Sequence, residues 1–143
     1  MPEGRHHFGG AHDREALRSS LQVVQSKRRQ GLVISTQGVG HVFPTGDLFR
    51  SLTLEIATED GWIERARFSR AFQLTVDEDG RVHKVPSEDT RLQPGESRLV
   101  STEGVPSGTG WRLRYHYGGA NDESRRLLTD DQLYFVVAQG VLD

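Results

Sequence analysis

Short stretches in which apolar and polar residues alternate dominate this sequence. In the clearest of them, Trp111, Leu113, Tyr115 and Tyr117 fall on one face of an extended chain. Two arginines and His116 fall on the other face. Similar alternation and a high content of β-branched residues predict further strands, at 21–25, 32–36, 48–58, 91–105 and 133–138.

Three segments need separate treatment. DREALRSS, residues 13–20, is rich in helix formers and has Asp13 at its start, which predicts a helix of about two turns. The strand at 48–58 is expected to bury one face only. Residues 62–72 follow no clear period: Trp62 and Ile63 suit a hairpin, whereas 64–72 suits either a helical turn or an irregular edge strand.

Several short strands about ten residues apart, separated by Gly and Pro turns, favour an antiparallel, immunoglobulin-like β-sandwich. The amphipathic helices of a doubly wound α/β fold are missing from the sequence. We therefore predict a mainly β protein with a short N-terminal helix. Residues 1–20 form a His- and Gly-rich leading segment with that helix, and residues 21–143 form the sandwich domain.

Composition narrows the function classes. The chain has 143 residues, a formal net charge of -2 and no cysteine. The charge argues against nucleic acid as a partner, and no apolar run approaches the length of a membrane helix, so no direct membrane insertion is expected. Without cysteine there are no disulfides, thiolate metal sites or covalently attached haem within this chain. The first residues also lack the apolar region of a signal peptide.

Two segments bear most of the candidate chemistry. HHFGGAHD, residues 6–13, places His6, His7 and His12 on a glycine-rich stretch. Imidazole is the commonest protein ligand for metals, and Asp13 could orient one of these rings. A surface loop with incidental histidines is the alternative interpretation.

The second segment, GVGHVFPTGD, spans residues 38–47. Its glycines and Pro44 predict a tight corner between strands. Within that corner His41 is either a ligand or, as we favour, a hydrogen-bond partner of Asp47.

The remaining candidates are weaker. His83 is expected to be exposed, and His116 to lie on the outer face of its strand without a special role. Trp62 and Trp111 could line a sugar-binding platform, although strand aromatics more often belong to the core. Neither a nucleophile elbow nor a phosphate-binding Walker motif is present, so an enzyme is the least favoured class.

Taken together, the leading segment and the corner resemble the C-terminal non-haem β-sandwich module of bacterial multihaem c-type cytochromes. In that family a CxxCH haem-attachment motif is often followed directly by Met-Pro, then by a segment like His7–Asp13 and later by a corner like Gly40–Asp47. The resemblance is best over roughly the first 56 residues. It implies extracytoplasmic or periplasmic electron transfer, with His7 or His12 as an axial ligand to haem c attached outside this chain. It implies a structural or ligating role for His41.

The sequence departs from the family because it contains no CxxCH. We therefore expect that it is truncated just after such a motif, with Met1-Pro2 where the residues after the motif would fall. The expected partner is a haem-bearing domain or a redox partner protein. Two alternatives stay open: a non-catalytic module that binds protein or carbohydrate, and an independent metal site of His7, His12 and His41 with ligands about 2.1 Å from the metal.

Overall fold

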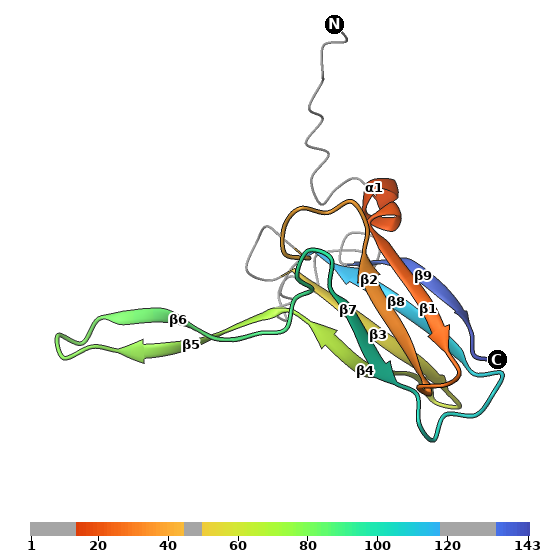
Figure 1. Ribbon diagram of the computed structural model, residues 1–143. Helices are drawn as coiled ribbons and strands as arrows, with labels where there is room; N and C mark the ends of the chain where they lie inside the picture. Colours follow the sequence, from red (N-terminus) through yellow and green to blue (C-terminus); the bar gives the residue numbers. More distant parts are fainter. Residues whose placement is uncertain (1–13, 45–49, 118–133) are drawn as a thin grey trace, which may run out of the picture.

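The computed structural model describes residues 14–44, 50–117 and 134–143. Within these ranges the chain forms one short helix and nine strands (Figure 1). The helix α1 spans Arg14–Ser19. The strands are β1 Leu21–Ser26, β2 Gly31–Thr36, β3 Ser51–Thr58, β4 Gly61–Phe68, β5 Arg70–Val76, β6 Val82–Asp89, β7 Ser97–Ser101, β8 Gly110–His116 and β9 Tyr134–Val141.

The strands form two facing antiparallel sheets and a separate hairpin. One sheet has the order β1-β2-β7 and the other the order β4-β3-β8-β9. Their inner faces supply the core, with Leu32 and Ile34 from the first sheet packed against residues such as Leu54, Leu113 and Tyr115 from the second. The predicted antiparallel β-sandwich with a short N-terminal helix is confirmed.

Alternation along the strands explains which side chains enter the core. In β8, Trp111, Leu113 and Tyr115 are buried, while the residues between them are only half-buried. β8 therefore presents one apolar face to the opposite sheet, as expected for two packed layers. Burial of these large side chains is the main contribution to the stability of the fold.

The hairpin of β5 and β6 projects away from the sandwich as an arm (Figure 1). Its two strands pair only with each other, from Arg70 opposite Asp89 to Val76 opposite Val82. A turn at 77–80 closes it, with Gly80 at a φ of 77°. We refer to Arg70–Asp89 as the arm.

The structure decides between the two alternatives for residues 64–72 and corrects one expectation about β3. Residues 64–72 are not a helical turn, because they belong to β4, at the edge of its sheet, and to the start of β5. The irregular edge is the better description, since the register of β3 and β4 shifts between Leu54 and Glu55. The expectation that β3 buries one face was wrong: Ser51, Thr53 and Glu55 on its outer face are buried as well.

Candidate functional site

The predicted ligand residues fall mostly outside the described ranges. His6, His7, His12 and Asp13 precede Arg14, and Asp47 lies within 45–49, so their predicted roles stay predictions. His41 is described. Its side chain is exposed, and its Nδ1 lies 3.1 Å from the carbonyl oxygen of the adjacent Val42.

The corner that holds His41 is fixed to the sandwich through its neighbour. Phe43 forms an antiparallel bridge with Leu92, with both backbone hydrogen bonds between 2.7 and 2.8 Å. Phe43 and Pro44 are buried, and the peptide bond between them is cis. The described part of the corner therefore anchors an aromatic ring in the core and leaves His41 at the surface.

Phe43 belongs to a group of aromatic and arginine side chains at the end of the sandwich that carries α1. We call this group the aromatic–arginine cluster; it consists of Phe43, Tyr115, Tyr117, Phe135, Arg14, Arg18 and Arg50. The rings of Tyr115, Tyr117 and Phe135 have centroids 5.5–5.6 Å apart. Such spacings are typical of favourable aromatic pairs.

Arginines surround these rings. The Arg14 guanidinium lies 5.2 Å from the centre of the Phe135 ring, and its Nε donates to the Tyr117 hydroxyl at 3.3 Å. Arg18 lies 5.5 Å from the same ring. Arg50 Nε is buried and has no hydrogen-bond partner among the described residues. Phe43, Tyr115 and Phe135 are buried in the core. At the surface the cluster therefore presents the half-buried Tyr117 ring and the arginines, which suit a carboxylate-bearing partner group.

A second constellation lies on the outer face of the four-stranded sheet, and the sequence did not reveal it. Glu55 of β3 is buried and pairs with two arginines of β8: Arg112 Nη2 lies 2.8 Å and Arg114 Nε 2.9 Å from its carboxylate oxygens. The Arg114 contact lacks hydrogen-bond geometry, so it is an ion pair only. Arg112 stacks on Trp62 at 4.2 Å and Arg114 on Tyr134 at 3.8 Å. We call this group on the outer face of the sheet, which consists of Glu55, Arg112, Arg114, Trp62 and Tyr134, the outer-face ladder.

His116 and Trp62 have surroundings that the sequence did not predict. His116 does lie on the outer face, but it is half-buried and its Nε2 lies 2.9 Å from Thr53 Oγ1. Desolvation, reinforced by Arg114, lowers the pKa of His116 to about 4. Trp111 is in the core as predicted, whereas Trp62 is 43% exposed and stacks in the ladder.

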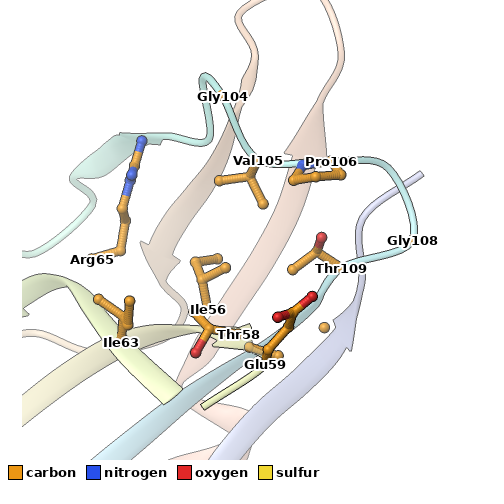
Figure 2. A pocket seen from close by; sticks show the side chains of 12 residues that line it. Ile56, Thr58, Glu59, Ile63, Arg65, Gly104, Val105, Pro106, Gly108 and Thr109 are labelled. Carbon is orange, nitrogen blue, oxygen red and sulfur yellow. The ribbon is translucent and has the colours of Figure 1, made fainter. Parts of the chain in front are cut away.

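An open cavity of about 620 Å³ lies where the sandwich ends at the β3–β4 turn (Figure 2). Its wall is largely apolar, with Ile56 and Ile63 on one side and Val105 and Pro106 on the other. Arg65 stands at its edge and is held there by hydrogen bonds to the carbonyl oxygens of Ser101 and Glu103. The cavity offers an apolar contact surface.

Neither a metal site nor a membrane-spanning helix is found among the described residues. Within 14–44, 50–117 and 134–143, no three His, Asp or Glu side chains converge as a metal site would require. In the same part of the chain, no helix is both long and apolar enough to cross a membrane.

Comparisons with known proteins add a fold relationship. No family model matches the sequence, and no curated protein is significantly similar to it. Among solved structures, the chain is similar to a penta-haem cytochrome c552 from Thermochromatium tepidum, with a TM-score of 0.57 and 21% identity. The match covers 96% of this chain but only 43% of the cytochrome. The chain therefore has a fold that also occurs in a multihaem cytochrome c, where it accounts for less than half of the polypeptide.

Proposed function

We propose that this protein is an accessory β-sandwich domain in multihaem electron transfer. In this proposal it docks on a haem-bearing domain or partner and supplies His7 or His12 as an axial ligand. The observation that carries the proposal is the fold match along 96% of the chain to a penta-haem cytochrome. The sequence segments 6–13 and 38–47 support it independently through their resemblance to such modules.

The aromatic–arginine cluster supports the α1 end of the sandwich as the docking surface. A haem carries two carboxylates, and the cluster offers the guanidinium groups of Arg14, Arg18 and Arg50 over an aromatic core. The chain has no cysteine, so the haem would be attached to the partner. When bound there, it would supply the redox-active iron, while this chain would contribute an imidazole.

Chain connectivity favours His12 over His7 as the residue nearest the cluster. His12 is two positions from Arg14, which limits the distance between their Cα atoms to roughly 7 Å. His7 is seven residues from Arg14 and could reach roughly 24 Å. A donor close to the cluster is therefore expected to be His12, and a more distant haem would require His7. The proposal also places the protein outside the cytoplasm, in the compartment of c-type cytochromes.

Axial ligation can be tested with a haem c undecapeptide that carries one histidine ligand and leaves the sixth coordination position open. Titration with the purified protein should shift the Soret band to a low-spin, bis-histidine spectrum. The double variant His7→Ala/His12→Ala should bind the peptide at least tenfold more weakly. The single variants then decide which of the two histidines is the donor.

His83→Ala is the matched control, because His83 lies on the arm and pairs with Asp77 at 2.6 Å. It should bind the haem peptide like the unmodified protein. Equal binding by the double variant, or loss of binding in His83→Ala, contradicts the assignment of His7 and His12. A protein that leaves the haem peptide spectrum unchanged at saturating concentration contradicts the axial role as a whole.

A further inference from the structure

The arm has one apolar side that its own sandwich does not cover. In an antiparallel pair, directly opposed residues point to the same side, so Leu74, Val76, Val82 and Lys84 share one side with Phe72. Leu74 is 70% exposed, Val76 66% and Val82 63%. We call this the apolar side of the arm.

The opposite side of the arm is more polar. Gln73, Thr75 and His83 lie there, with Val85 as its apolar member. The two sides differ in the way that is typical of a sheet with one packed and one solvated face. The apolar side therefore has the character of a contact surface.

The base of the arm is fastened to the sandwich, so the arm is held in its projecting position. The Thr90 hydroxyl accepts a hydrogen bond from Ser69 N at 3.0 Å. Arg98 donates to the carbonyl oxygens of Thr90 and Arg91 and stacks on Phe68 at 5.2 Å. A two-stranded hairpin alone is marginally stable in water, and this one extends beyond its anchored base (Figure 1). Contact between the apolar side of the arm and another surface would stabilise the hairpin.

Among the described residues, the outer face of the sheet β1-β2-β7 is a second uncovered surface. Its residues form three rows across the strands, and none of them is charged: Gln22, Ser35, Ser97; Val24, Val33, Leu99; Ser26, Gly31, Ser101. Charged residues make up 27% of the chain, and the outer face of the other sheet carries the arginines of the outer-face ladder. In the middle row, Val24 is 49% and Leu99 40% exposed. We call this the uncharged face.

We propose that two copies of this chain form a dimer by reciprocal exchange of their arms. The apolar side of each arm packs on the uncharged face of the other copy. The uncharged face accepts apolar side chains without desolvating any ion. Lys84 and Arg70, which both lie close to the Phe72 ring, keep their charged groups at the margin of the contact.

The dimensions favour reciprocal exchange. The seven paired positions of β5 and β6 give an arm roughly 23 Å long and about 10 Å wide, and three strands give a face about 14 Å wide. One arm on one face buries on the order of 500 Å² of total accessible surface, which is below the range of specific interfaces. Two symmetric contacts bury on the order of 1,000 Å², which is about the minimum for a biological interface.

Other pairings of two copies are less favourable. If two arms packed against each other, both uncharged faces would stay exposed to water. If two uncharged faces packed together, both arms would keep their apolar sides in water. Only the reciprocal exchange covers both surfaces in both copies.

Sedimentation equilibrium over a roughly hundredfold range of concentration tests the proposal, because dimer formation follows mass action. The unmodified protein should approach twice its monomer mass of 16.0 kDa. The arm variant Leu74→Glu/Val82→Glu and the face variant Val24→Glu/Leu99→Glu should each raise the dissociation constant at least tenfold. Thr75→Glu, on the opposite side of the arm, is the control and should dimerise normally. Circular dichroism checks that each variant is folded.

Mixing the two double variants separates arm exchange from the other pairings. The face variant keeps an intact arm and the arm variant an intact face, so a mixture should recover one of the two contacts and form more heterodimer than either variant forms homodimer. A monomeric unmodified protein overturns the proposal. So does a dimer that survives the face variant, which indicates arm-to-arm packing, or one that survives the arm variant, which indicates face-to-face packing.

Discussion

The imidazole Nε2 of His116 lies 2.9 Å from the hydroxyl oxygen of Thr53 on the neighbouring strand. The ring sits on the outer face of the four-stranded sheet, 5.9 Å from the Tyr134 ring. Its surroundings disfavour a positive charge. Desolvation is the largest cause, Arg114, Arg67 and Arg112 add repulsion, and Glu64 opposes them in part.

The lowered pKa of His116 predicts that the folded protein loses stability in mild acid. Between its ordinary value of 6.5 and about 4, the unfolded state binds a proton that the folded state does not. This loss begins as pH falls below 6.5 and is complete near pH 4. After discounting for partial exposure, it amounts to on the order of 1–2 kcal/mol.

Urea unfolding at pH 7 and pH 4.5 measures this effect. Because carboxylates also titrate in this range, the unmodified protein is compared with His116→Gln, which cannot take up the proton. The difference in free energy of unfolding between the two pH values should be smaller in His116→Gln. Identical pH dependence in both proteins contradicts the prediction.

Removal of the Glu55 charge should destabilise the fold. Glu55→Gln leaves the partly buried Arg112 and Arg114 without their carboxylate, and breaking a buried ion pair in this way costs about 2–4 kcal/mol. Glu64→Gln is the matched control, because Glu64 pairs with Arg67 at 2.6 Å in an exposed position and exposed pairs contribute under about 1 kcal/mol. Urea unfolding compares them, and equal losses in the two variants rule out a special role for Glu55.

The alternating strands could be predicted because their burial is written in their own residues. Trp111, Leu113 and Tyr115 mark the inner face of β8 without reference to any other strand. β4 has no such pattern, since it is a largely exposed edge strand. β5 does alternate, with Phe72, Leu74 and Val76 on one side, but it belongs to the projecting arm and none of these side chains is buried. The extended conformation of β4 and β5 depends on pairing with β3 and β6, which local sequence does not specify.

Glu55 and His116 illustrate why the outer face could not be predicted. A glutamate that alternates with Leu54 and Ile56 indicates an exposed position. Glu55 is buried because the register places Arg112 directly opposite it and the arginines then cover it. Register depends on the whole sheet. For the candidate site, His41 lies exposed beside Val42, and its role as a ligand or as the partner of Asp47 stays a prediction. His7 and His12 lie outside the described residues and stay predictions as well.

Gly140 marks a position where β9 must approach Trp111 closely. A Cβ atom at Gly140 would lie 2.8–3.0 Å from atoms of the Trp111 indole. Gly140→Ala should therefore displace this core ring and lower the free energy of unfolding by about 1–3 kcal/mol. Thermal or urea unfolding measures the loss, and tryptophan fluorescence reports the displacement.

Gly110→Ala is the matched control for Gly140→Ala. A Cβ atom at Gly110, on the paired strand β8, would make only ordinary contacts of 3.7 Å or more. Its effect should stay below about 1 kcal/mol. If both alanine variants are equally stable, Trp111 accommodates the methyl group without cost and the steric argument is wrong.

Tyr115 predicts a stability change at high pH of the opposite direction to that of His116. Burial, the largest cause, raises the pKa of Tyr115 to about 12, with Arg50 opposing and Tyr117 adding to the shift. Between pH 10 and 12 the folded state keeps a proton that the unfolded state loses, so stability falls as pH rises through this window.

Absorbance at 295 nm should show one of the three tyrosines ionising only near pH 12. Tyr115→Phe should remove that late step and reduce the loss of stability, whereas Tyr134→Phe, which removes a phenol on the outer face of the sheet, should retain it. A late step that persists in Tyr115→Phe assigns the shifted phenol to another residue.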